Sequence, residues 1–197
     1  MGSHQQAAAG KRADAARNIA AITDAALDLF SRDRTVSMAD VARAAGVGRV
    51  TLYAHFPSRE ALLDAVLAAA IEQADRALDA CSPEEGPADE AFARLVRSAW
   101  SILDKHRGLH VNALAELGTD RMRAGHAPTL GRVERLIARG QAEGVFRTDL
   151  PLTWLVTTVY SLLHAAAAEA DSGLLTPEAL PAVLETTLLA ILRPPLT

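Results

Sequence analysis

Two short apolar segments that flank Gly46 constrain the fold of this chain more than any other feature of its sequence. The first segment carries Val41 and the small residue Ala42, and Gly46 follows four residues after Ala42. Val47 comes next, and Leu52 lies six residues beyond the glycine. A small residue lets two helices approach closely, and glycine adopts the turn conformation that a β-carbon resists. This spacing predicts a helix-turn-helix unit, whose second helix enters the major groove of DNA.

Helical periodicity dominates the rest of the chain. Alanine supplies 41 of the 197 residues, and apolar side chains recur at intervals of three and four. Because alanine loses no side-chain entropy in a helix, both features favour an all-α protein, with about nine helices and no strand. The expected helices cover 16–31, 37–45, 49–56, 59–80, 88–107, 108–124, 128–143, 151–170 and 180–192. We expect residues 1–13 to be frayed, 82–87 to form a linker, 171–177 to form a turn, and Gly108 and Gly118 to interrupt their helix.

The second helix of the predicted unit carries side chains that suit DNA. Arg49 at its start can donate to a phosphate or to a guanine edge. Val50 and Thr51 offer methyl groups to bases, and Thr51 also offers a hydroxyl. Tyr53 and His55 follow on the side that would face the DNA backbone. We therefore expect these five residues to contact DNA.

Two helix starts frame the same unit. Ser37 precedes Asp40 by three residues, the spacing of a capping box. The helix N-termini at Ser37 and Arg59 supply backbone amides that suit phosphate, so both residues are expected DNA contacts. Residues 1–60 hold eight Lys or Arg and six Asp or Glu, a net charge of +2, whereas the remainder of the chain has a net charge of −6. A locally basic end on an acidic chain is compatible with a nucleic-acid partner.

The stretch from Arg17 to Val66 resembles the DNA-binding domain of TetR-family transcriptional regulators. The resemblance implies an all-α protein with an N-terminal helix-turn-helix domain, here 14–58. It also implies a C-terminal domain, here 59–197, that binds a small molecule and dimerises through its last two helices. The matching residues are Ile19, Ala25–Ala26, Leu29–Phe30, Val41–Ala42, Ala45–Gly46–Val47, Thr51–Leu52–Tyr53, His55–Phe56, Ser58 and Glu60.

Carried over by position, the resemblance puts Tyr53, His55 and Arg59 at phosphates. It puts Arg49, Val50 and Thr51 near bases. Three positions depart from the family pattern: Arg34 stands where a glycine is usual, Gly48 where a serine is common, and Arg59 where a lysine is usual. Gly48 removes a side-chain cap from the third helix, and the arginine at 59 preserves the charge that a phosphate contact needs.

The C-terminal helices offer many apolar side chains and few inward charges. Since the resemblance implies a cavity among the middle helices, we expect a mostly apolar small-molecule effector held by a few hydrogen bonds. The last helix carries a wide aliphatic stripe. Exposed on a monomer, this stripe would form a large hydrophobic patch, so we expect the last helix to lie at a two-fold dimer interface. The expected ligand contacts are Trp100, Leu103, His110, Leu117, Thr157 and Tyr160, and the expected dimer contacts are Leu163, Leu184, Leu188 and Ile191.

Other classes of site have less support. The single cysteine, Cys81, excludes an intramolecular disulfide framework and suits a cytoplasmic protein. His106 and His110 have the spacing of a ligand pair, but no third ligand lies nearby, so we expect no metal and no cofactor. His164 is expected to be a satisfied core histidine. Residues 150–168 carry no charge, but their polar residues and acidic flanks argue against a membrane span.

The sequence contains none of the phosphate loops, nucleophile elbows or zinc spacings that mark common enzyme sites. We therefore expect no catalytic residue and no enzyme activity. The expected function is a ligand-responsive transcriptional repressor that binds an inverted-repeat operator as a homodimer. The alternative is a helical small-molecule-binding protein or enzyme with a vestigial DNA-binding end. A salt-dependent, sequence-specific shift of duplex DNA distinguishes the two.

Overall fold

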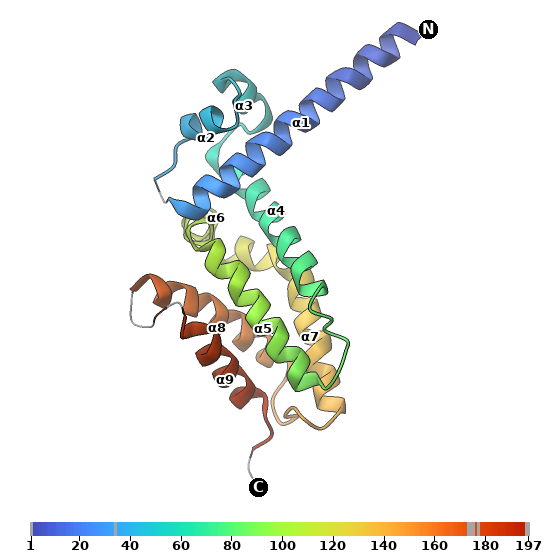
Figure 1. The fold of residues 1–197 in the computed structure, drawn as a ribbon, viewed down its shortest axis with the longest axis vertical. Coiled ribbons are helices and arrows are strands. Elements are labelled where there is room, and N and C mark those ends of the chain that lie inside the picture. The colour runs from blue at the N-terminus through green and yellow to red at the C-terminus, as the bar shows by residue number, and fades with distance from the viewer. Residues whose placement is uncertain (1, 34, 173–175, 177, 196–197) are drawn as a thin grey trace. The chain divides into compact units, whose positions relative to one another are not determined.

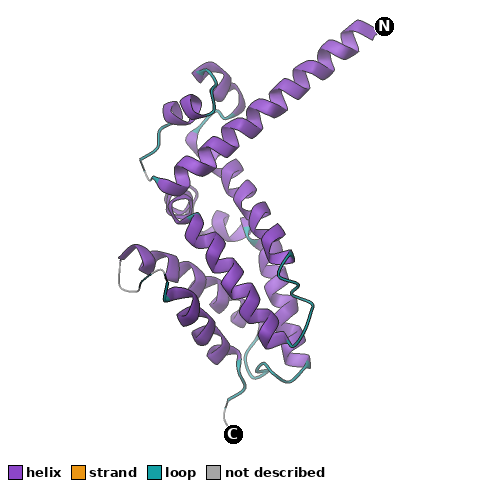
Figure 2. Ribbon diagram, viewed as in Figure 1, coloured by secondary structure: helices purple, strands orange, loops and turns teal. Residues whose placement is uncertain are grey.

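The structure is a computed structural model that describes residues 2–33, 35–172, 176 and 178–195. Within these residues it contains nine helices and no strand (Figure 2), which confirms the expected all-α fold. The departure from the family pattern at Arg34 lies outside the described residues, as does most of the expected turn at 171–177. The helices are α1 (Gly2–Arg32), α2 (Met38–Ala44), α3 (Arg49–His55), α4 (Arg59–Asp79), α5 (Ala88–Lys105), α6 (Arg107–Gly125), α7 (Ala127–Ala142), α8 (Leu152–Ser172) and α9 (Leu180–Leu192).

Two helix boundaries differ from expectation. The first helix begins at Gly2 rather than near residue 16, so the prediction of a frayed start was wrong. The alanines at 7–9, 13, 15 and 16 explain this, because alanine has the highest helix propensity. In α6, Gly118 interrupts the helix as predicted, with φ 78° and ψ 168°. Gly108 does not, and its role is a close approach described below.

The chain divides into two compact units, and the division falls within α4. The first unit comprises Met1–Ala70 and His106–Met122, and the second comprises Ile71–Lys105 and Arg123–Thr197. In the first unit, α1, α2, α3, the start of α4 and most of α6 surround one apolar core. Its largest fully buried side chains include Ile22, Phe30, Leu52, Leu62 and Leu63.

The second unit is a bundle in which α5, α7, α8 and α9 pack against one another (Figure 1). Its core includes Phe92 and Phe146, whose rings meet edge to face at 5.8 Å and 77°. Gly140 on α7 lies against Phe146, and a β-carbon there would come within 2.0 Å of the phenyl ring. The sequence therefore needs glycine at 140 for close packing. Among the described residues, no helix combines the length and apolar character needed to cross a membrane.

Candidate nucleic-acid interface

A complete capping box starts α2. The Ser37 hydroxyl oxygen accepts from the Asp40 backbone N–H at 3.2 Å, and an Asp40 carboxylate oxygen accepts from the Ser37 backbone N–H at 3.1 Å. The Ser37 hydroxyl also donates to this carboxylate at 2.5 Å. Hydrogen bonds from the Ser37 side chain and backbone, followed by the charge of Arg43, lower the pKa of Asp40. The predicted cap is confirmed, and the Ser37 hydroxyl is engaged within it.

The turn after α2 is a Schellman motif. The Val47 N–H donates to the Ala42 carbonyl at 3.0 Å, and the Gly46 N–H donates to the Arg43 carbonyl at 3.2 Å. Gly46 has φ +68°, which L side chains rarely adopt. Gly48 then caps α3 without a side-chain hydrogen bond, as its lack of a hydroxyl requires. The turn conformation thus follows from Gly46, the glycine that the spacing singled out.

The α3 helix divides its side chains between the core and the surface. Leu52 is fully buried, whereas Arg49 is exposed, Val50 is 86% exposed and Tyr53 is 49% exposed. Thr51 and His55 are half-buried. No other large apolar side chain among the described residues is as exposed as Val50. The structure therefore presents Arg49, Val50 and Tyr53 outward, the residue types that read base edges and hold phosphates.

Arg59 differs from these residues because its guanidinium is engaged inside the first unit. It donates to the Val36 carbonyl and, at 3.0 Å, to the Asn112 side-chain oxygen. It also lies 4.8 Å from the centroid of the Phe30 ring, and its Nε is 4.0 Å from a Glu116 carboxylate oxygen. The side chain is 27% exposed. Arg59, an expected phosphate contact, therefore already has partners within the chain, as the Ser37 hydroxyl does.

Comparison with known proteins now adds to this geometry. Residues 22–66 match the sequence profile of bacterial regulatory proteins of the tetR family. This part of the chain is therefore similar to the DNA-binding region of tetR-family regulators. The matched residues span the end of α1, the helix-turn-helix and the start of α4, and they lie within the 17–66 stretch that carries the resemblance in the sequence.

Curated relatives match part of the chain as well. The chain is 35% identical over 82 residues to the HTH-type transcriptional repressor LfrR of Mycolicibacterium smegmatis, covering 42% of this chain and 43% of the relative. It is 36% identical over 75 residues to the HTH-type transcriptional regulator EthR of Mycobacterium tuberculosis, covering 38% of this chain and 34% of the relative. These matches therefore span less than half the length of either relative.

Solved structures resemble the whole chain in fold. The TetR-like regulator LfrR from Mycobacterium smegmatis in complex with proflavine has a TM-score of 0.69 at 23% identity and covers 89% of this chain and 96% of that one. The regulator FadR from Bacillus subtilis in complex with stearoyl-CoA has a TM-score of 0.72 at 17% identity and covers 88% of this chain and 98% of that one. At these identities the likeness shows the fold alone.

The residues expected to contact a ligand fall into both units of the chain. Trp100, only 3% exposed, and Leu103 pack in or against the core of the second unit, which also contains Thr157 and Tyr160. His110 and Leu117 belong to the first unit, where Leu117 packs against the core. Neither unit alone gathers all six residues, so their shared ligand role stays a prediction.

A polar and aromatic cluster surrounds Tyr160 on α8, and sequence reasoning found only part of it. The Arg123 guanidinium donates to the Thr157 hydroxyl at 2.9 Å and lies 5.5 Å from the Tyr160 ring centroid. The His126 ring meets the Tyr160 ring at 5.5 Å and the His164 ring at 5.3 Å. Burial raises the pKa of Tyr160, and the charge of Arg123 opposes that rise. Arg123 and His126 lie more than 30 residues from Tyr160 in the sequence, so no helical spacing could have revealed them.

Most of the residues expected at a dimer interface lie in the core of the second unit, and their role at an interface stays a prediction. Leu188 is 0%, Leu184 5% and Leu163 9% exposed, and all three belong to the core of the second unit. Ile191 is half-buried. The aliphatic stripe of α9 therefore packs against α5 and α8 of the same chain. The outer side of these helices includes Trp154 on α8 and Val183 on α9, which are 59% and 41% exposed.

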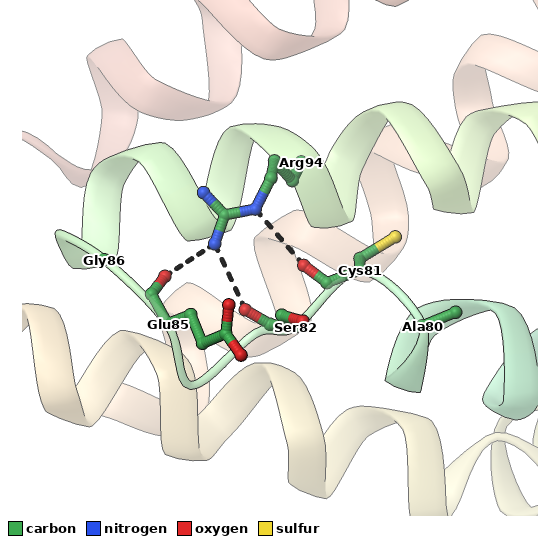
Figure 3. Close-up of a pocket in the computed structure, with 6 residues that line it drawn as sticks. All are labelled: Ala80, Cys81, Ser82, Glu85, Gly86 and Arg94. Carbon is green, nitrogen blue, oxygen red and sulfur yellow. Dashed lines mark hydrogen bonds between the residues drawn. The ribbon is translucent and has the colours of Figure 1, made fainter.

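The expected linker at 82–87 is pinned to the second unit by an arginine. The Arg94 guanidinium on α5 donates to the carbonyl oxygens of Cys81, Ser82 and Glu85, at 3.2, 3.1 and 2.6 Å (Figure 3). The surface depression beside it is lined by Ala80, Cys81, Ser82, Glu85, Gly86 and Arg94. Because these bonds satisfy backbone carbonyls of the turn, we infer that Arg94 has a structural role and stabilises the turn.

Proposed function

We propose that this protein is a ligand-responsive transcriptional repressor of the TetR family that binds an inverted-repeat operator through α3. The observation that carries the proposal is the sorting of the α3 side chains. Leu52 anchors the helix in the core while Arg49, Val50 and Tyr53 stay exposed. A fully exposed valine between an arginine and a tyrosine gives a folded chain no stability, but it gives a DNA-reading helix a methyl contact beside two hydrogen-bonding groups. Thr51 and His55 complete the proposed contact surface.

The proposed repressor acts as a homodimer, because an inverted repeat is read by two copies related by a two-fold axis. The exposed Trp154 and Val183 support a pairing face on the outer side of α8 and α9. Tryptophan is among the residues that contribute most at protein interfaces. The buried Leu163, Leu184 and Leu188 would then support this face from within, with Ile191 nearer its edge.

The proposed effector is a mostly apolar small molecule bound by the second unit. The aliphatic side chains packed around Trp100 favour such a ligand, and the cluster of Thr157 and Tyr160 with Arg123 offers it a few polar contacts. Two fold neighbours were solved with proflavine and stearoyl-CoA, and both ligands have large apolar parts. The curated relatives are named as transcriptional regulators, so we propose regulation and no enzyme activity.

A selection experiment tests the DNA-binding proposal. Duplexes with a randomised centre would be incubated with the full chain, and the bound fraction would be amplified and sequenced. We expect enrichment of an inverted repeat whose half-sites lie roughly 34–36 Å apart or somewhat more. Deleting one half-site should weaken binding steeply. An unchanged sequence distribution after selection would contradict the proposal and favour a ligand-binding protein with a vestigial DNA-binding end.

A further inference from the structure

A polar pair inside the first unit joins four elements that lie far apart in the sequence. Asn112 on α6 is only 7% exposed, and its side-chain oxygen accepts from the Arg59 guanidinium at 3.0 Å. Its amide nitrogen donates to the carbonyls of Phe30 and Asp33 at 3.4 and 3.3 Å, and to its own helix at Gly108 at 3.0 Å. The amide therefore donates to carbonyl groups in the last turn of α1 and just after it.

Close packing of α6 on α1 holds this pair in place. A β-carbon at Gly108 would lie 2.6 Å from the backbone oxygens of both Phe30 and Ser31, so only glycine permits the contact. On the same side of α6, His106 and the Ser31 hydroxyl share a hydrogen bond of 2.8 Å. Leu109, 2% exposed, adds an apolar contact to the core of the unit.

The other half of the pair reaches the start of the helix-turn-helix. Arg59 begins α4, and its guanidinium donates to the carbonyl of Val36, the residue before the cap of α2. The same group lies over the Phe30 ring on α1. One side chain thus fixes where the chain enters α2 relative to α1, α4 and α6. The position of α2 in turn sets that of α3, because the Schellman turn allows little freedom between them.

We propose, on the basis of the proposed DNA binding, that Arg59 is a positioning residue and not a phosphate contact, and that Asn112 is its partner in that role. Both terminal nitrogens of Arg59 donate to groups within the unit. The Glu116 carboxylate near the remaining nitrogen offsets the charge and would repel a phosphate. The pair holds the helix-turn-helix in the geometry that presents α3 to DNA.

The salt dependence of DNA affinity separates a positioning role from a contact role. The DNA-binding constant K falls as the salt concentration rises, so a plot of log K against log[salt] has a negative slope. Each lost phosphate contact makes this slope less steep by about 0.9, whereas a misplaced helix lowers affinity at every salt concentration alike. The full chain and a duplex selected as above would be measured by fluorescence anisotropy over a salt series. Circular dichroism would establish that each variant is folded at the temperature of the measurement. The exposed Arg49→Ala variant is the matched control for a lost base contact, and it should weaken binding and relax base preference.

The Arg59→Lys variant decides between the roles, because it keeps the charge but loses the planar fork that reaches two acceptors. We expect about tenfold weaker binding with an unchanged slope for Arg59→Lys and for Asn112→Ala. The double variant Arg59→Ala/Asn112→Ala should bind DNA no more weakly than Arg59→Ala alone, since both changes break the same hydrogen-bonded pair. These results would support the positioning role even if Asn112→Ala fails to fold, because the lysine variant reports independently.

Two results would overturn the inference. One is that Arg59→Lys binds DNA with wild-type affinity. The other is that Arg59→Ala makes the salt slope less steep by about 0.9 while Asn112→Ala keeps the wild-type affinity and slope. Purely additive effects in the double variant would also count against a shared role. Absence of specific binding by the wild-type chain, or an unaffected Arg49→Ala variant, would count against the proposed function instead. The two failures are therefore distinguishable.

Discussion

The short helices α3 and α9 differ in how well their buried and exposed faces could be predicted from the sequence. In α3, the spacing around Gly46 indicated that Leu52 faces inward and that Arg49, Val50 and Tyr53 face outward, and the structure places them so. In α9, a broad aliphatic stripe suggested a surface for a second subunit, yet Leu184 and Leu188 lie in the chain's own core. A motif with a fixed turn specifies which face of a helix is exposed to solvent. An apolar stripe specifies only that this face of the helix is buried, and does not say whether the same chain or a second subunit buries it.

The largest expected effect separates the buried stripe of α9 from its outer face. Truncating fully buried Leu188 to alanine should lower the free energy of unfolding by about 2–5 kcal/mol, because it leaves a cavity in the core of the second unit. The matched truncation Val183→Ala, on the same helix but 41% exposed, should leave unfolding of the isolated chain almost unchanged. Chemical denaturation measures both. Equal losses for the two variants would contradict the placement of the stripe.

A pair of glycines on α7 tests the packing of the second unit. Gly140→Ala forces a β-carbon into the Phe146 ring and should destabilise the chain by about 1–3 kcal/mol. Gly131 meets only the end of the Arg135 side chain at 3.7 Å, so Gly131→Ala should stabilise α7 by up to about 1 kcal/mol through helix propensity. Thermal melts of the two variants should therefore shift in opposite directions. Shifts in the same direction would show that Phe146 does not pack on α7 as described.

Two α3 variants sharpen the distinction between base and phosphate contacts. Arg49→Ala should weaken binding to the selected duplex by about 1–3 kcal/mol and relax base preference near its position. Tyr53→Phe should weaken binding to all duplexes alike, by less, because a phosphate contact carries no sequence information. Titrations on the selected duplex and on a scrambled one provide the comparison. Sequence preference lost through Tyr53→Phe but not through Arg49→Ala would reverse the two assignments.

The smallest expected effect concerns the cap of α2. Ser37→Ala removes the side-chain acceptor for the Asp40 N–H and should cost about 1 kcal/mol of stability. The wild-type cap also depends on pH, because the pKa of Asp40 is lowered in the folded chain by its bonds to Ser37. Its contribution is fully present above the ordinary aspartate pKa of about 3.9 and is lost as the pH falls through the lower folded value. A Ser37→Ala difference that stays constant from neutral pH to pH 3 would contradict this coupling.

Local chemistry decided how much of this protein could be predicted. The capping box at Ser37, the turn at Gly46 and the break at Gly118 depend on a few neighbouring residues, so the sequence alone indicated them. The internal role of Arg59 depends on Asn112, 53 residues further along the chain, and no local pattern reports such a contact. The cluster of Arg123 and His126 around Tyr160 was missed for the same reason. A resemblance assigned Arg59 to phosphate by position, whereas its neighbours in space give it other partners.

The most direct test of the central claim, that the exposed face of α3 reads DNA, is the Val50→Glu variant. Val50 is 86% exposed, so the change should leave the melting temperature as it is in the wild-type chain. A carboxylate at this position would face the negative charge of DNA, and affinity for the selected duplex should fall more than about tenfold. Fluorescence anisotropy of the wild-type and Val50→Glu chains on one duplex, at one salt concentration, provides the measurement. Wild-type affinity in a folded Val50→Glu chain would contradict the account.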